Sequence, residues 1–122
     1  MSSSTRAAIM FATDDIICPK GTTCKISCSV YNENGEEITI PLSATAYIGI
    51  KRRATDVTVV INQAMTLNQS TNTFETTLSA TTTNIAVGRY EFDILYSYNS
   101  EIYQIMRGVF HVIPVCATVG GG

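Results

Sequence analysis

The sequence predicts an all-β protein, and three observations support this. Apolar and polar residues alternate along several short segments, which is the pattern of strands with one buried face. Turn signals, among them Pro19-Lys20-Gly21 and Asn34-Gly35, separate these segments at short intervals. No segment shows the apolar period of a long helix. We therefore expect an antiparallel β-sandwich of about seven to eight strands.

The chain is long enough to form one domain with its own core. A domain of 122 residues buries roughly two-thirds of its unfolded surface without disulfides or metals. Eight basic and ten acidic residues give a formal net charge of −2, which implies neither a nucleic-acid partner nor a membrane surface. The amino end lacks a convincing secretion signal, and no segment has the length of a membrane helix, so we expect synthesis in a cytoplasm.

The amino end, residues 1–17, is predicted to be an arm or an edge strand. Its apolar residues Ile9, Met10 and Phe11 fit a first edge strand of the domain, or an arm that docks on a partner. The sandwich is predicted to span residues 18–116. The glycine-rich residues 117–122 are predicted to form a flexible tail.

The first half of the sandwich is predicted from three alternating rows. Residues 23–31 place four side chains inward: Cys24, Ile26, Cys28 and Val30. A loop over 32–36, with its Asn-Gly pair, leads to a short return strand over 37–40. The next inward row is Ala44, Ala46, Ile48 and Ile50. A further strand is expected from Val57 to Ile61, and residues 62–72 are expected to form a polar connection with room for a short strand around Met65 and Leu67.

The second half is predicted to be organised around a hairpin over residues 87–114. A strand at 74–78 and one helical turn at 79–84 lead to it. Its first strand places Tyr90, Phe92, Ile94 and Tyr96 inward. Tyr98-Asn99-Ser100 supplies the turn, and the second strand, 102–113, stops at Pro114.

The four cysteines are predicted to be free, buried, structural thiols. Cys24 and Cys28 lie about 13 Å apart on one strand, whereas a disulfide tolerates a Cα separation of only about 7 Å. These two therefore cannot pair. Pairing of Cys18 with Cys24, or of Cys116 with either, remains geometrically open. With no Cys-x-x-Cys pair and one histidine, a zinc site is not expected.

Catalytic chemistry is sparse, and we expect no enzyme, no cofactor and no metal. His111 has no nucleophile signature around it. Glu91 and Asp93 lie roughly 7 Å apart on one strand face, a glycosidase-like separation, yet they read as a solvent-facing row. Asp14 and Asp15 would need calcium ligands from elsewhere. The basic residues 51–53 are too few for nucleic-acid binding.

The last strand carries an apolar row on the face opposite its core residues. If Phe110 and Val112 line the core, then Val109, His111 and Ile113 face outward. Such a patch is seldom left bare on a monomer. We expect it to be an interface, covered by the amino-terminal arm of the same or a neighbouring chain, or else by residues 62–72. The residues assigned to this interface are Ile9, Met10, Phe11, Leu95, Tyr103, Val109, His111 and Ile113.

Two groups of motifs resemble a known family. The first is Gly21-Thr22-Thr23, Asn34-Gly35, Ile38 and the strand from Ala44 to Lys51; the second is Ser79-Ala80, Gly88-Arg89-Tyr90-Glu91-Phe92-Asp93-Ile94 and Arg107-Gly108-Val109-Phe110-His111-Val112 before Pro114. Over residues of about 20–115, the chain is similar to the immunoglobulin-like amino-terminal domain of the baseplate upper proteins of tailed phages.

The resemblance implies a structural role in a virion. Family members carry a linker and a further domain behind this one, whereas the printed sequence ends at Gly122. We therefore expect a linker between other virion proteins, or a plaque on a capsid. The expected partners are virion proteins and copies of the chain itself. The alternative is a receptor- or carbohydrate-binding adhesion module that uses loop tyrosines such as Tyr98 and Tyr103.

Overall fold

The structure, a computed structural model, describes residues 9–10 and 12–117. The predictions for residues 1–8, for Phe11 and for the tail beyond residue 117 lie outside the described residues. The described part contains these strands: β1 (Ile9–Met10), β2 (Ala12–Thr13), β3 (Ile16–Pro19), β4 (Cys24–Cys28), β5 (Tyr31–Asn32), β6 (Thr45–Lys51), β7 (Ile61–Asn68), β8 (Thr73–Leu78), β9 (Gly88–Tyr98) and β10 (Glu101–Ile113).

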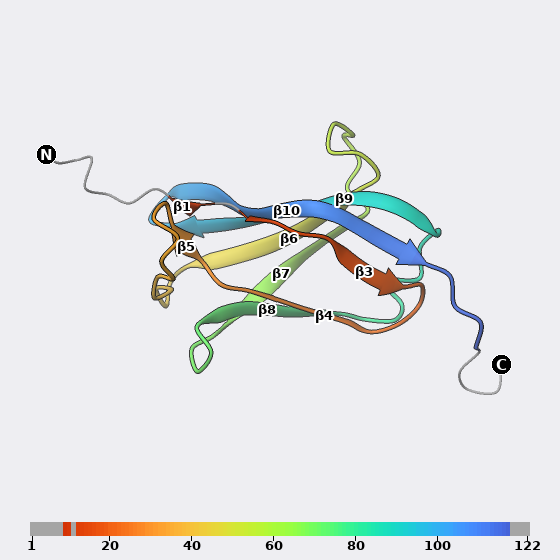
Figure 1. Cartoon of the computed structure of the whole chain (residues 1–122), viewed down its shortest axis with the longest axis horizontal. Helices are drawn as coiled ribbons and strands as arrows, with labels where there is room; N and C mark the ends of the chain where they lie inside the picture. Colours follow the sequence, from red (N-terminus) through yellow and green to blue (C-terminus); the bar gives the residue numbers. More distant parts are fainter. Residues whose placement is uncertain (1–8, 11, 118–122) are drawn as a thin grey trace, which may run out of the picture.

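All the strands except β1 and β5 form one sheet that folds back on itself. Neighbours along it run in the order β2-β10-β9-β6-β7-β8-β4, with β3 also beside β10, while β1 and β5 form a separate two-stranded ribbon. In Figure 1, β10, β9 and β3 lie along one side of the molecule, β8 and β4 along the other, and β7 crosses between them. The predicted all-β class is confirmed.

The pairing is not entirely antiparallel. β2 and β3 both run parallel to β10, with Met106 opposite Ala12 and Phe110 opposite Ile16. The amino-terminal segment therefore extends the edge of the sheet from residue 12 to residue 19. Long-range pairing of this kind has no local sequence signal, which explains why the periodicity alone indicated an antiparallel sandwich.

The predicted β9–β10 hairpin is confirmed. Glu101 lies opposite Tyr98, so Asn99 and Ser100 alone form the loop. Both have positive φ, 56° and 68°, which is the conformation of a two-residue turn whose twist matches that of the strands. β6 pairs with the other edge of β9. The hairpin thus forms the centre of the larger layer.

The predicted inward rows form the core. All the inward residues predicted on the 44–50 segment and on β9 are buried, as are Ile26, Cys28 and Val30, while Cys24 is half-buried. Phe74 and Leu78 from β8 and Phe110 and Val112 from β10 pack into the same cluster. The ring of Phe74 meets that of Tyr96 edge-on, with centroids 6.0 Å apart. Period-two alternation therefore identified both layers of the core.

The prediction of a strand from Val57 to Ile61 is wrong. Residues 52–60 form the β6–β7 loop, and Val57 is 96% exposed. β7 instead occupies 61–68, because Ile61 pairs with Ile50 and Met65 with Ala46. The short strand allowed around Met65 and Leu67 thus lies within β7, and only the rest of the expected polar connection is a turn. The cross-strand register, rather than the local alternation of valines, decides where the return strand begins.

The return strand expected over 37–40 is also absent. A single bridge joins Tyr31 and Glu37. Beyond it, the side-chain amide of Asn72 satisfies the backbone, since it donates to Ile38 O at 2.8 Å and accepts from Ile40 N at 2.9 Å. A side chain from the β7–β8 turn thus replaces a strand ladder here.

The segment expected to hold one helical turn contains two turn hydrogen bonds, from Thr83 N to Ser79 O at 3.0 Å and from Asn84 N to Thr81 O at 3.3 Å. Ser79 Oγ accepts from Thr82 N at 3.2 Å, as an N-cap does. The hydroxyl of the fully buried Thr83 donates to Thr22 O at 2.6 Å. This contact ties the connection before β9 to the turn before β4.

All four cysteines are free thiols in the structure, but they are not all buried. Cys18 and Cys28 are buried, Cys24 is half-buried and Cys116 is exposed. Cys116 follows Pro114, after β10 has ended, so it lies outside the packed core. The expectation of buried thiols is therefore wrong for Cys116.

Stability should fall at alkaline pH because of Cys28. Burial raises the pKa of this thiol from 9.0 to about 11, so the unfolded chain releases the proton first and unfolding is favoured as pH rises through that window. The expected loss is about 1.4 kcal/mol per pH unit for this thiol. Urea unfolding at several pH values should show a shallower fall for Cys28→Ala than for the wild type, and equal slopes would contradict this assignment.

Candidate functional site

The candidate site is the outward surface of β6, β9 and β10, called here the outer face. Along β9 it carries every second residue, because the residues between them line the core. The register places Tyr47 beside Leu95, Lys51 beside Glu91, and His111 beside Arg89. The outer face comprises Tyr47, Gly49, Lys51, Arg89, Glu91, Asp93, Leu95, Gln104, Arg107, Val109 and His111.

A hollow of about 530 Å³ lies on the outer face. The β6–β7 loop, with Ala54 and Val59, forms one side, and Thr13 of β2 lies on the other. Gly49, the cross-strand partner of Asp93, also lines the hollow and contributes no side chain to fill it. Leu95 and Val109 both line the hollow.

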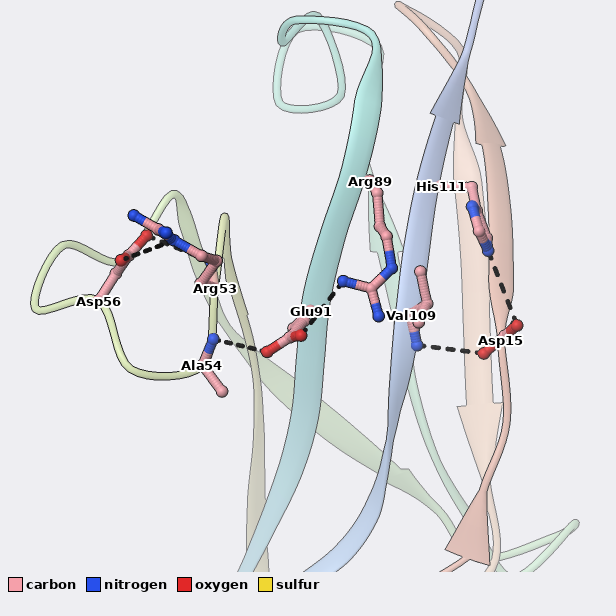
Figure 2. Close-up of polar contacts among 8 residues, drawn as sticks. All are labelled: Asp15, Arg53, Ala54, Asp56, Arg89, Glu91, Val109 and His111. Atoms are coloured by element: carbon pink, nitrogen blue, oxygen red, sulfur yellow. Dashed lines mark hydrogen bonds and ion pairs between the residues drawn. The ribbon is translucent and has the colours of Figure 1, made fainter.

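Glu91 joins the loop to the sheet at one side of the hollow. Its carboxylate accepts a hydrogen bond from Ala54 N at 2.6 Å and another from Arg89 Nη1 at 3.2 Å. Figure 2 shows these contacts running from the loop, across β9, towards β10. Within the loop, Arg53 and Asp56 form an ion pair, with Arg53 Nε 3.6 Å from Asp56 Oδ1.

The carboxylate of Asp93 also accepts a hydrogen bond from a neighbouring strand. Its Oδ2 accepts from Gln104 Nε2 at 3.0 Å, across the β9–β10 pair. The two carboxylates singled out for their glycosidase-like spacing therefore both serve as hydrogen-bond acceptors between neighbouring segments.

Asp15 is likewise a hydrogen-bond acceptor between two segments, at the opposite side of the outer face. Its Oδ1 accepts from Val109 N at 3.1 Å, and its Oδ2 lies 3.7 Å from His111 Nε2. Figure 2 places both contacts between β10 and the segment that leads into β3. The hydrogen bond from Val109 N to Asp15 thus joins the amino-terminal segment to the edge of β10.

The basic residues at 51–53 do not act as a cluster. Lys51 lines the hollow, the guanidinium of Arg52 lies 4.8 Å from the centre of the Tyr90 ring, and Arg53 pairs with Asp56. Their charges point to three different neighbours, which leaves no basic patch for a polyanion.

Tyr103 does not belong to the outer face, which corrects the predicted interface set. The β9–β10 register shifts between Gln104 and Met106. This bulge at Ile105 reverses the alternation, so Tyr103 lies opposite Tyr96, with ring centroids 6.3 Å apart, and packs on the core. Its hydroxyl donates to Glu101 Oε1 at 2.6 Å. A bulge adds one residue to a strand and has no clear local signal.

The other predicted interface residues divide into two groups. Leu95, Val109, His111 and Ile113 remain on the outward side of β9 and β10, half-buried or exposed. Ile9 and Met10 form β1, which pairs with Asn32 and Tyr31 of β5 instead of crossing the outer face. Phe11 lies outside the described residues. Residues 62–72 do not cover the row either, because β7 takes up most of them.

Two exposed apolar residues, one at each end of the outer face, were not predicted. Ile102, next to the hairpin turn, is 68% exposed, and Ile17 of β3, beside His111, is 65% exposed. Both follow from pairing: Ile102 lies opposite Ser97, diagonal to Leu95, while Ile17 faces outward because its neighbour Cys18 is buried. The sequence could have indicated the outward position of Ile102 alone, because Ile102 alternates with Tyr103 along the strand.

Within the described residues, no group of three or more histidine, cysteine or acidic side chains is placed to hold a metal ion. The described part of the chain also has no helix long and apolar enough to cross a membrane. A scan against protein-family models and a search of curated proteins find no match to this chain.

Proposed function

We propose that the chain is a non-enzymatic structural subunit of a tailed-bacteriophage virion. It acts as a tail or baseplate component, or as an auxiliary subunit attached to the head, and is assembled in the host cytoplasm. Its partners are other virion proteins and copies of itself. The proposal rests on the similarity of residues 20–115 to the baseplate domain and on the character of the outer face.

The observation that carries the proposal is the apolar content of the outer face. Tyr47 and Leu95 lie side by side there, with 49% and 41% of their surfaces exposed. Ile102 extends this patch at the hairpin end, and Ile113 is exposed at the other end of β10. Each exposed Å² forgoes about 25 cal/mol of possible burial, so apolar side chains on adjacent strands favour a surface that a partner covers.

The hollow between these apolar ends suits a protein contact. Three of its charged groups are already engaged, since Arg89 pairs with Glu91 and Asp93 accepts a hydrogen bond from Gln104. A partner that seats on this face therefore meets preorganised polar groups flanked by apolar side chains, an arrangement common in stable interfaces.

Substitution of the β10 row tests the proposal. Val109→Thr combined with Ile113→Lys should leave the fold intact, because Val109 is half-buried and Ile113 is exposed. The double variant should not oligomerise and should not enter particles. Sedimentation velocity at concentrations of tens of micromolar, and incorporation into the virion, measure the two effects.

Leu42→Lys is the matched control, since Leu42 is an exposed apolar residue in the loop before β6. It should assemble as the wild type does. A double variant that unfolds would assign the row to the core, and one that assembles normally would place the partner surface elsewhere. A wild-type chain that stays monomeric and enters no particle contradicts the proposal.

The alternative function, a carbohydrate- or receptor-binding module, is favoured by the hollow itself. Amide and carboxylate side chains from Asn62, Asp93 and Gln104 line it, and such groups hydrogen-bond sugar hydroxyls. Of the two tyrosines predicted for this role, Tyr98 is exposed beside the hairpin turn, whereas Tyr103 packs against the core. A glycan array separates the two functions, because a purely structural subunit shows no selective binding.

A further inference from the structure

The loop between β6 and β7 has an exposed apolar tip, residues 57–60. Val57 is 96% exposed, and Val59 and Val60 are 44% and 38% exposed. In Figure 1 this loop rises beyond the layer of β9 and β10, on the side away from β4 and β8. The tip therefore projects from the outer face, beside the hollow that Ala54 and Val59 line.

Hydrogen bonds within the loop and to β9 order the tip. Asp56 N donates to Arg53 O at 2.9 Å, and Arg53 N donates to Asp56 Oδ2 at 3.2 Å. Ala54 N donates to Glu91 of β9 at 2.6 Å. Because the side chains of Arg53 and Asp56 also form an ion pair, these two residues add no net charge beside the tip. A loop that is ordered before binding loses less conformational entropy when a partner covers it.

The hollow carries polar side chains with unused hydrogen-bonding groups. A Cβ placed on Gly49 would lie 3.7 Å from Asp93 Oδ1 and 3.9 Å from Asn62 Oδ1, so these two oxygens flank the bare glycine. From the described residues, Asp93 accepts a side-chain hydrogen bond only through Oδ2, from Gln104. Within the same part of the chain, the side chains of Asn62 and Lys51 form no hydrogen bond or ion pair. Acceptor oxygens and an ammonium group are therefore available to a partner.

The loop tip and the hollow are complementary in chemistry. The backbone N–H groups of residues 57–59 donate to none of the described residues, and the hollow offers acceptor oxygens. The apolar side chain of Val57 matches those of Leu95 and Val109, which line the hollow. Since the loop's own ion pair balances its charges, burial of the tip leaves no charge of that pair without a partner.

We propose that two copies of the chain pair through their outer faces, with the loop tip of each copy seated in the hollow of the other. Tip and hollow lie side by side on one face. Half a turn about an axis between them, in the plane of the face, therefore places each tip over the hollow of the second copy. A two-fold contact of this kind is closed and forms a dimer. The inference rests on the function proposed above, because it names a second copy as the partner of the outer face.

Val57→Asp tests the contact in the full chain. Because Val57 is almost fully exposed, the variant should unfold in urea as the wild type does. In the dimer, the new carboxylate would approach Asp93 of the second copy, and like charges repel. Sedimentation equilibrium should show a dimer dissociation constant that is raised about tenfold or more. Leu42→Asp, at a loop position that is 75% exposed, is the matched control and should dimerise as the wild type does.

A mixture of two variants tests the reciprocal geometry. Gly49→Leu fills the hollow with a side chain and leaves the tip intact, whereas Val57→Asp alters the tip and leaves the hollow intact. Neither variant alone can match a tip to a hollow. Mixed in equal amounts, they form a pair with one matching contact, so the mixture should associate more tightly than either variant by itself.

Cross-linking from the tip gives a second measurement. A photoreactive benzophenone side chain replaces Val57, and labelled and unlabelled chains are mixed before illumination. Covalent dimers should join labelled to unlabelled chains, and peptide mapping should place the link at residues that line the hollow, such as Leu95 or Val109. This result decides the inference even if Gly49→Leu does not fold.

The inference is overturned if Val57→Asp dimerises as the wild type does, or if the cross-links lie outside the hollow of the second copy. A wild-type chain that enters particles but stays monomeric in solution also overturns it and leaves the proposed function standing. If Val57→Asp assembles normally while Val109→Thr with Ile113→Lys does not, the outer face remains the partner surface and the reciprocal contact alone is wrong.

Discussion

Gly108→Ala should destabilise the protein strongly, because the space beside Gly108 is filled by backbone. A Cβ at this position would lie 1.5 Å from Asp14 O and 2.6 Å from Asp14 C. Backbone atoms cannot rotate away as the end of a side chain can. Since Asp14 N also donates to Arg107 O at 3.0 Å, relief of the clash requires the segment between β2 and β3 to leave β10. We expect a loss of about 3 kcal/mol or more in urea unfolding.

Gly49→Ala is the matched control on β6. Its Cβ would meet Asp93 Oδ1 at 3.7 Å and Asn62 Oδ1 at 3.9 Å, which are ordinary contacts with side chains. The variant should lose less than about 1 kcal/mol. Hydrogen exchange adds a second readout, since Gly108→Ala should expose the amides of residues 12–19 first. Equal stability of the two glycine variants would show that the amino-terminal segment does not lie against Gly108.

The hairpin and the core rows were predictable because their signals are local. Tyr90, Phe92, Ile94 and Tyr96 alternate with polar residues and precede a two-residue turn, so both the strand and its buried face follow from the sequence. The predicted inward residues 44–50 follow by the same reasoning. Strand pattern is reliable wherever one face is apolar and the other polar.

The outer face was predicted less completely, because its shape depends on register between distant segments. Val57 and Val59 alternate as a strand would, yet the pairing of Ile61 with Ile50 leaves them in a loop. The bulge at Ile105 turns Tyr103 inward. The hollow arises where the 52–60 loop, the three strands β6, β9 and β10, and the β2 edge meet, and no single segment contains that information.

Phe92→Ala should unfold a marginal domain. Phe92 is 4% exposed at the middle of β9, between Ile50 of β6 and Gly108 of β10. Its ring covers Gly108, since Phe92 Cε1 lies 3.2 Å from the position of a Cβ there. Truncation to alanine therefore leaves a cavity that a glycine on the neighbouring strand cannot fill. The expected loss is about 3–5 kcal/mol, out of a total stability on the order of 5–15 kcal/mol.

Leu95→Ala is the control for Phe92→Ala, because Leu95 lies on the same strand but on the outer face and is 41% exposed. It should cost less than about 1 kcal/mol of unfolding free energy and should weaken assembly instead. Urea unfolding at one pH compares the two variants directly. A loss below about 1 kcal/mol for Phe92→Ala, or a larger loss for Leu95→Ala, would mean that the two faces of β9 are interchanged, and the interface proposed for the outer face would then have no basis.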